Sequence, residues 1–257
     1  MAEKRNNDEM LVINKILDKY KYSSNKNITI FTDFLNLHEQ NLFINSKKQF
    51  SSTNYILYGG YYYSERKVIA FYPDYVNVDE IIYPVDILKI SPNNNKYTNK
   101  LTHRDFLGSI LGLGITRAKV GDIVTNENFA IVFVNCSVSE YIVSNLHLVK
   151  NTAVNVEKLR TLPTEILTPK YKLIKGTISS IRLDSIVSLA FPLSRAKATS
   201  MIKSKNVYIN SQLIISPSHK LHEGDIVSVR GMGKFLFNRI GNTTKKDRIN
   251  IELKRYI

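Results

Sequence analysis

The sequence is poor in cysteine and contains no long apolar run. Its one thiol, Cys136, cannot form a disulfide within the chain, which excludes a disulfide-rich secreted scaffold and favours a reducing cytosol. Its longest apolar runs, such as 129–134, have the length of a strand and fall short of the ~18–20 residues of a membrane span. The polar stretch 1–8 lacks the apolar core of a signal peptide. We therefore expect a cytoplasmic protein that does not enter the membrane.

Acidic residues are scarce in the last third of the chain. Residues 171–257 hold 16 lysines and arginines against 5 aspartates and glutamates, a net charge of +11, whereas residues 1–170 hold 20 against 17. Such an asymmetry indicates a polyanionic partner. An anionic membrane surface would require a basic amphipathic helix with bulky apolar anchors, and no such helix stands out.

Hydrophobic periodicity predicts an α+β protein with several domains. A small α+β region is expected over residues 1–80, because helical spacing of apolar residues is followed there by two β-rich runs. Its expected elements are a helix that includes 11–20 and is capped by Asp8, a helix over 37–48, and strands at 55–58 and 68–72.

Residues 81–160 follow the order β-α-β-β-α-β, the ferredoxin-like pattern that RNA-recognition-motif domains share with many unrelated domains. RNA-recognition motifs stack bases on sheet aromatics, and here Phe129 and Phe133 could either stack a base or belong to the core. The tyrosines at 55, 58, 61, 62 and 63 leave the same two options open. The expected elements are strands at 85–90, 122–124, 128–134 and 153–156, with helices at 103–113 and 139–149.

Residues 161–180 are rich in Lys, Pro and Thr and are expected to form a linker or a lead-in strand, followed by a compact module over 181–257. An apolar stripe over 183–190 predicts a helix that Pro192 ends, and Ser194 is a natural N-cap for the next helix. The remaining expected elements are a hairpin around 210–211, a strand at 226–229 and one more strand near the end of the chain.

The second helix of this module begins with a cluster of cations. Arg195 and Lys197 lie in its first turn, where free backbone N–H groups already favour a phosphate. The same cations oppose the helix macrodipole, and a bound RNA phosphate would relieve that conflict. The alternative is an ordinary solvated basic face. The residues expected to bind RNA are Arg182, Ser194, Arg195, Lys197, Lys203, Lys205, Arg230, Lys234, Lys245, Lys246 and Arg248.

Other local motifs do not support a catalytic, cofactor or metal site. His103-Arg104-Asp105 copies a kinase triplet, but the other kinase motifs are missing, so the triplet is expected to begin a helix. Arg117 stands where a dinucleotide-binding loop would need its third glycine. His219 and His222 have no cysteine nearby, and Cys136 has no paired histidine. We therefore expect no catalytic residue, no cofactor and no metal.

The C-terminal pattern resembles the S-four RNA-binding domain, named after ribosomal small-subunit protein four. Along nearly its full length, the chain also resembles the YlmH-like proteins of Gram-positive bacteria and photosynthetic organisms. The motifs that carry the two resemblances are Arg182-Leu183-Asp184, Ser194-Arg195-Ala196-Lys197 and Val207-Tyr208-Ile209-Asn210 for the S-four domain, and Thr32-Asp33-Phe34-Leu35, Gly59-Gly60, Glu65-Arg66-Lys67, Tyr72-Pro73-Asp74-Tyr75, His103-Arg104-Asp105-Phe106, Leu113-Gly114-Ile115-Thr116-Arg117 and Gly121-Asp122-Ile123 for the wider family.

This resemblance implies a modular protein that binds ribosomal and transfer RNA on the large ribosomal subunit. Members of the family are implicated in the rescue of stalled peptidyl-tRNA during ribosome-associated quality control, and a role near cell division has been attached to them. The S-four domain usually has Gly where this chain has Lys205, and often where it has Ser211, which bears on turn geometry and not on the basic face. Secondary ribosome contacts are expected at Arg104, Arg117 and Lys119.

We interpret the chain as a non-enzymatic, monomeric RNA-binding protein whose partners are rRNA, tRNA and the large ribosomal subunit. Two alternatives remain. An RNA-modifying enzyme, similar to pseudouridine synthases or methyltransferases, would use the S-four module to deliver substrate. It would need an S-adenosylmethionine loop or a uridine-isomerising aspartate loop upstream, and neither is found. A division-associated scaffold would instead bind its partners without RNA.

Overall fold

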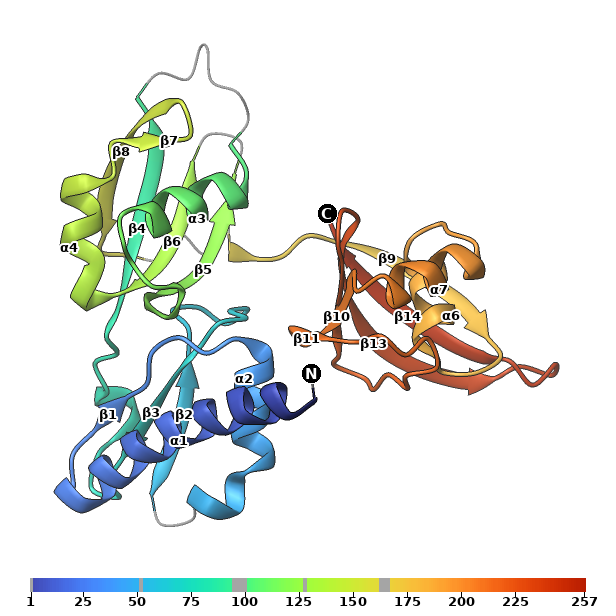
Figure 1. Cartoon of the computed structure of the whole chain (residues 1–257), viewed down its shortest axis with the longest axis horizontal. Helices are drawn as coiled ribbons and strands as arrows, with labels where there is room; N and C mark the ends of the chain where they lie inside the picture. The colour runs from blue at the N-terminus through green and yellow to red at the C-terminus, as the bar shows by residue number, and fades with distance from the viewer. Residues whose placement is uncertain (1, 51–52, 94–100, 127–128, 162–166) are drawn as a thin grey trace. The chain divides into compact units, whose positions relative to one another are not determined.

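The computed structural model describes residues 2–50, 53–93, 101–126, 129–161 and 167–257 (Figure 1). The chain divides into two compact units, Met1–Thr168 and Pro169–Ile257, and each is described by itself. The first unit contains two sheets and the second contains one. Mixed helices and sheets in several parts confirm the predicted multi-domain α+β class.

The N-terminal part of the first unit is a three-stranded antiparallel sheet covered by two helices. Its strand order is β1-β3-β2, and α1 and α2 pack on the sheet through a core that includes Ile16, Phe43 and Phe71. Helix α1 begins at Ala2, so the prediction that Asp8 caps it is wrong. The elements are α1 (Ala2–Lys26), β1 (Ile30–Phe31), α2 (Leu37–Asn45), the 3₁₀ turn η1 (Lys47–Phe50), β2 (Asn54–Tyr58) and β3 (Val68–Tyr72).

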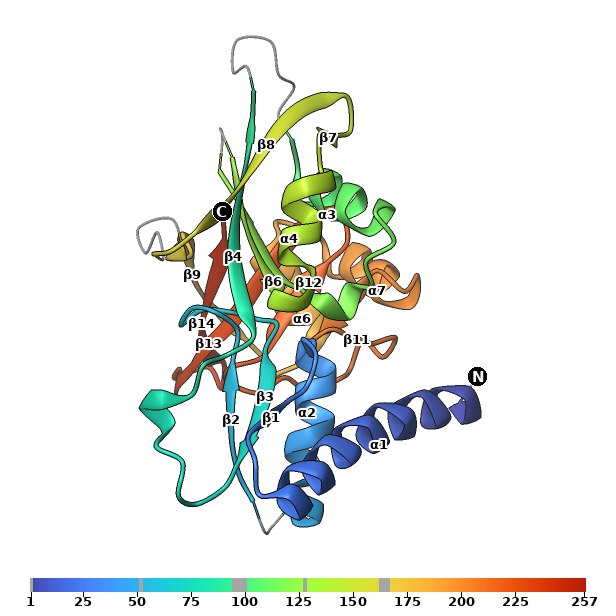
Figure 2. The ribbon, with the colours of Figure 1, turned by 90° about the vertical axis from the view of Figure 1, so that its left-hand side faces the viewer.

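The second sheet of this unit has the strand order β5-β6-β4-β8-β7, antiparallel throughout. Four of these strands with the two helices between them reproduce the predicted β-α-β-β-α-β arrangement. Helices α3 and α4 lie on the same face (Figure 2), above a core that includes Leu88, Ile110 and Ile142. The elements are η2 (Val78–Glu80), β4 (Val85–Pro92), α3 (His103–Gly112), η4 (Arg117–Lys119), β5 (Val120–Thr125), β6 (Ala130–Asn135), α4 (Cys136–Asn145), β7 (Leu148–Val149) and β8 (Thr152–Leu159).

Side-chain caps set where the two helices of this sheet begin. The Thr102 hydroxyl accepts a hydrogen bond from the Asp105 amide, and the Asp105 carboxylate accepts one from the Thr102 amide, which forms a capping box. Asn135 accepts the amide of Ser137, so α4 begins at Cys136 and not at Ser139 as predicted.

The second unit is a six-stranded antiparallel sheet with two helices against one face. Its strand order is β11-β10-β12-β13-β14-β9, and Leu183, Ile186, Ile202 and Phe235 are fully buried in the shared core. The long strand β13 was not predicted, whereas β9 occupies the expected lead-in segment. The elements are β9 (Tyr171–Ile178), α6 (Leu183–Ala190), α7 (Arg195–Lys203), β10 (Val207–Ile209), β11 (Gln212–Leu213), β12 (Ile226–Val229), β13 (Gly233–Thr243) and β14 (Ile249–Tyr256).

Two turns of this unit use left-handed backbone at non-glycine residues. Asn210 and Ser211, with φ of 48° and 66°, join β10 to β11 as the predicted two-residue hairpin turn. Lys205, which follows the C-cap residue Ser204 of α7, has φ of 61°, so it takes the left-handed capping position itself. The departures from glycine at 205 and 211 therefore leave the turn geometry in place.

Candidate nucleic-acid interface

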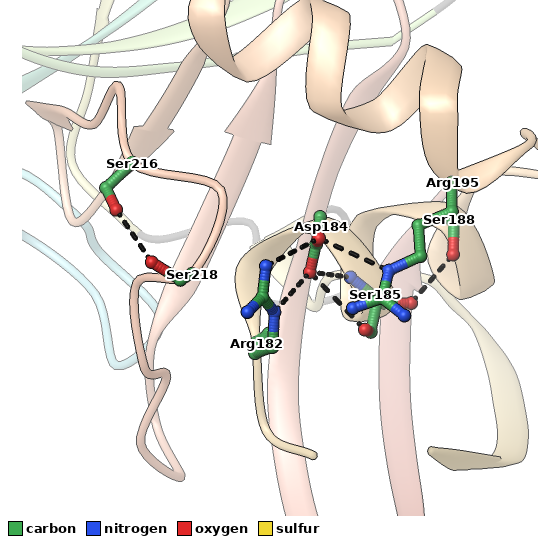
Figure 3. Close-up of polar contacts among 7 residues, drawn as sticks. All are labelled: Arg182, Asp184, Ser185, Ser188, Arg195, Ser216 and Ser218. Carbon is green, nitrogen blue, oxygen red and sulfur yellow. Dashed lines mark hydrogen bonds and ion pairs between the residues drawn. The ribbon is translucent and has the colours of Figure 1, made fainter. Parts of the chain in front are cut away.

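A buried carboxylate connects the two cations nearest the starts of α6 and α7. Asp184 is 3% exposed, and its Oδ2 accepts Nη2 of Arg182 at 3.1 Å and Nε of Arg195 at 3.2 Å. Nε of Arg182 also donates to Oδ1 at 3.2 Å, so Arg182 binds the carboxylate with two N–H groups. Figure 3 shows both guanidinium groups directed at Asp184. We call Arg182, Asp184 and Arg195 the arginine–aspartate cluster.

The electrostatics of the cluster keep Asp184 ionised. Burial alone would raise the pKa of Asp184, but hydrogen bonds from Arg182 and Arg195, together with their charges, hold it below its ordinary value. The hydrogen bonding of Arg182 to Asp184 and the negative charge of that carboxylate raise the pKa of Arg182 in turn. Two cations and one anion leave the cluster with a net positive charge, and Lys197 adds a further positive charge two residues after Arg195.

The start of α7 partly contradicts the expected electrostatic conflict. The predicted cap is confirmed, because Oγ of Ser194 accepts the amide of Lys197 at 3.2 Å. However, Arg195 is already paired with Asp184, so a carboxylate of the protein itself offsets the repulsion between this cation and the helix macrodipole. RNA is therefore not needed to relieve the conflict at Arg195, whereas Lys197 is exposed and keeps its charge available.

A loop from a distant part of the sequence packs against the start of α6. The first amides of this helix, those of Leu183 and Asp184, donate to the carbonyls of His219 and Pro217 at 2.9 and 3.0 Å. Ser218 and Lys220, the exposed neighbours of these two residues in the chain, therefore belong to a loop that is fixed at the start of α6. The sequence patterns did not indicate the role of Asp184, although Arg182-Leu183-Asp184 is one of the motifs of the S-four domain.

The remaining predicted RNA-binding residues fall into three further places. Lys203, Lys205 and Arg230 are exposed around the end of α7, where the Arg230 amide donates to the Asn206 carbonyl at 2.8 Å. Lys245, Lys246 and Arg248 surround the β13–β14 turn, and Nη2 of Arg248 donates to the Thr177 carbonyl at 2.7 Å. Lys234 alternates with core residue Phe235 and therefore points from the opposite sheet face, where its Nζ lies 4.5 Å from the Tyr256 ring centroid.

The face of the middle sheet that RNA-recognition motifs use for base stacking is covered in this protein. Phe133 is 0% exposed, and its ring stacks on Tyr61 with centroids 4.9 Å apart and planes inclined by 17°. All six residues of β6 are buried, because the helices cover one face while Phe34, Val68 and Tyr61 pack against the other. Phe133 is therefore a core residue with the half-buried Tyr61 packed on it, whereas Phe129 is half-buried beneath Nζ of Lys89.

Arg66 and Asp122 join the N-terminal part of the first unit to the middle sheet. The Asp122 carboxylate accepts the amides of Glu65 and Arg66 and the hydroxyl of Tyr61, at 2.7 to 3.0 Å. The Arg66 guanidinium donates to the carbonyls of Phe34 and Val120 at 2.8 and 2.9 Å. Motifs that carry the wider family resemblance thus meet at one joint inside the first unit.

The predicted secondary contacts differ in how accessible they are. Arg117 belongs to this joint: it is half-buried and donates to the carbonyls of Val120 and Gly121, and burial together with the charge of Arg66 lowers its pKa to about 10. Nζ of Lys119 is paired with Asp33 at 2.6 Å. Arg104 is exposed on α3. Asp105, beside it, serves as a capping residue, as expected of a triplet that begins a helix.

Metal clusters and membrane-spanning helices are both absent from the described part of the chain. No three or more His, Cys, Asp or Glu side chains are grouped there so that they could hold a metal ion. None of the helices described above is long and apolar enough to cross a membrane.

Comparison with known proteins places two RNA-related domains on this chain. Residues 80–162 match the family described as a putative RNA-binding domain in YlmH, and residues 181–227 match the S4 domain. The resemblance to the YlmH-like S-four-domain RNA-binding proteins is confirmed. The second match contains the arginine–aspartate cluster and all of α6 and α7.

Two relatives extend this comparison. The chain is 27% identical over 251 residues to the protein of Bacillus subtilis called "Ribosome-associated protein quality control protein P2", with 96% of this chain and 95% of the relative covered. It also resembles the solved structure of the "Cell division protein ylmH from Streptococcus pneumoniae", with a TM-score of 0.51 and 24% identity over 63% of this chain and 95% of that chain. The second likeness bears on the fold alone.

Proposed function

We propose that this protein is a non-enzymatic RNA-binding protein that acts on the large ribosomal subunit during the rescue of stalled ribosomes. The observation that carries the proposal is the arginine–aspartate cluster, which holds two guanidinium groups at the surface of the S-four domain. Guanidinium groups fixed in this way suit phosphate oxygens, because their planar N–H groups bind such oxygens two at a time. The ribosomal setting is supported by the name of the Bacillus subtilis relative, because 96% of this chain aligns with 95% of that protein.

The RNA-binding surface that we propose is centred on the starts of α6 and α7. Arg182, Arg195 and Lys197 form its centre, and Lys203, Lys205 and Arg230 extend it past the end of α7. Lys245, Lys246 and Arg248 at the β13–β14 turn lie apart from this surface, as does Lys234 on the other face of the sheet. We propose that they contact RNA separately. Arg104 is the strongest candidate for a contact from the first unit, because Arg117 and Lys119 are engaged within the protein.

Sedimentation with purified bacterial ribosomal subunits tests this function. The full chain is centrifuged with large or small subunits over a series of KCl concentrations. We expect it to sediment with large subunits and to dissociate steeply with rising salt, because each neutralised phosphate releases counterions. Binding that is independent of salt would contradict the phosphate contacts. Equal binding to small subunits, or none to either, would contradict the assignment to the large subunit. Crosslinking followed by sequencing of the bound RNA would then locate the site.

The RNA-modifying alternative is tested by mass analysis of nucleosides. Total RNA from cells with and without the gene is compared, together with deletion cells that carry the wild-type chain or Asp105→Asn. We expect no modified nucleoside to change, because the Asp105 carboxylate is engaged in the capping box of α3, where it accepts hydrogen bonds from the amide and the hydroxyl of Thr102. A modified nucleoside that is lost on deletion and restored by wild type alone would establish an enzyme. Partner binding that survives ribonuclease treatment would favour the scaffold.

A further inference from the structure

One acidic side chain lies at the centre of the proposed RNA-binding surface, where a negative charge by itself repels RNA. Asp184 is nearly inaccessible, and its carboxylate also accepts the Ser185 amide at 2.8 Å. A buried ion pair is a weak source of stability, because the cost of desolvation offsets much of the attraction between the charges. The role of Asp184 is therefore better sought in what it does to its two partners.

Asp184 holds each arginine by one edge and leaves another edge directed away from it. Arg182 uses Nε and Nη2, whereas Arg195 uses Nε alone. Their side chains are 38% and 53% exposed, so part of each guanidinium is in contact with solvent. An unsupported arginine side chain populates many rotamers and loses that freedom on binding, whereas one already held by a carboxylate loses less.

We propose that Asp184 is a positioning residue for RNA phosphate, which holds Arg182 and Arg195 side by side so that their outer N–H groups bind the RNA backbone together. This inference rests on the proposed function and deepens it. The carboxylate also reduces the mutual repulsion of the two guanidinium groups, which allows them to lie close together before RNA arrives. Asp184 itself does not touch the RNA.

A positioning role and simple electrostatics predict opposite effects of Asp184→Asn on RNA affinity. Asp184→Asn removes a negative charge, so a binding step that depends only on net charge would become tighter. A positioning role predicts weaker binding, because both arginines lose the carboxylate that orients them. Asp247→Asn is the matched control: Asp247 is exposed at the β13–β14 turn of the same unit, and Asn tolerates its φ of 52° well.

The experiment measures affinity of the full chain for two probes, deacylated tRNA and a synthetic RNA stem-loop, over a salt series. We expect Asp184→Asn to weaken binding by about tenfold, the order of one charge-assisted hydrogen bond. Its plot of log affinity against log salt should be shallower by about one unit for each phosphate that is no longer neutralised. Asp247→Asn should bind as tightly as wild type or more tightly. Thermal unfolding and circular dichroism verify that each variant is folded.

A second variant keeps the proposal testable if Asp184→Asn fails to fold. Arg195→Lys keeps the positive charge but removes the contact between Nε and Asp184. The chain should tolerate this change, because the Arg195 side chain is half-exposed. It should weaken binding although the net charge is unchanged. Binding by Asp184→Asn that matches Asp247→Asn, or wild-type binding by Arg195→Lys, would overturn the positioning role and leave the RNA-binding function intact. Failure of the wild-type chain to bind either RNA would instead overturn the function and this inference with it.

Discussion

Tyr61 lies flat against Phe133, and Gly60 makes that contact possible. A Cβ atom at Gly60 would lie 2.2 Å from Cδ1 of Phe133, so any side chain there would displace the ring. The backbone of Gly60 also has φ of 96°, which side-chain-bearing residues rarely adopt. The N-terminal part of the first unit is therefore fitted against the middle sheet through a position that only glycine can occupy without strain.

Truncation of Phe133 should reduce stability without affecting RNA affinity. Phe133→Ala should lower the free energy of unfolding by roughly 3–5 kcal/mol, the cost of emptying a well-packed aromatic site. Urea unfolding followed by circular dichroism measures this change. Tyr62→Ala is the control, since Tyr62 is 88% exposed and should change stability by no more than about 0.5 kcal/mol. If the milder variant Phe133→Leu remains folded yet loses RNA affinity, the middle sheet binds RNA after all.

Two glycines of the first unit should respond to alanine in opposite directions. Gly60→Ala should destabilise by roughly 1–3 kcal/mol or more, because strained backbone and overpacking act together. Gly108 lies inside α3 with open space around it, so Gly108→Ala should stabilise by roughly 0.5–1 kcal/mol. Thermal unfolding of both variants measures the difference, and a neutral Gly60→Ala would show that the joint is loosely packed.

Some parts of this structure could be predicted because the information for them is local. Ser194 marks the start of α7 through its own side chain, and Asn210-Ser211 is a hairpin turn by residue type. Alternating and helical periodicity likewise indicated the order of strands and helices in the middle domain. Strand β13 was missed because glycines and asparagines such as Gly241 and Asn242 interrupt its apolar pattern, and sheet pairing with β12 and β14 overrides that weak propensity.

The centre of the candidate site could only be predicted in part. The basic residues were visible in the sequence, but the role of Asp184 depends on Arg195, which approaches it only after α6 and α7 have packed together. The covering of Phe133 by Tyr61 depends in the same way on contacts between segments far apart in the chain. The one local hint was an acidic residue, Asp184, beside the buried stripe of α6, where a charge requires a partner.

Removal of two charges should matter more at the start of α7 than at the β13–β14 turn. Arg195→Ala with Lys197→Ala should weaken RNA binding by roughly 1–3 kcal/mol, the order of one or two charge-assisted contacts. Lys245→Ala with Lys246→Ala removes the same charge from the same unit and should cost less. Fluorescence titration with one RNA at fixed salt compares them. Equal reductions in affinity would indicate diffuse attraction and no defined phosphate site.

Acid should reduce the stability difference between wild type and Asp184→Asn. The pKa of Asp184 is lowered in the folded chain, so its stabilising contribution is complete above the unfolded value, about 3.9, and is lost as the pH falls through the lower folded value. We expect the difference in thermal midpoint to be constant between about pH 7 and 5 and to narrow below about pH 4. Widening of the difference in acid would mean that the pairing of Asp184 with the arginines does not hold in solution.

The first and last strands of the second unit, β9 and β14, pair with each other. Tyr171 lies opposite Tyr256 in this ladder, and the Ile257 amide donates to the Lys170 carbonyl at 3.1 Å. The polypeptide therefore enters and leaves this unit at adjacent points, as it does in domains that can be inserted whole into a surface loop of another protein. The same ladder also means that the unit cannot be shortened to the matched stretch 181–227. That cut would remove the three longest strands of the sheet, β9, β13 and β14, and expose the apolar sides of the two helices that pack on them.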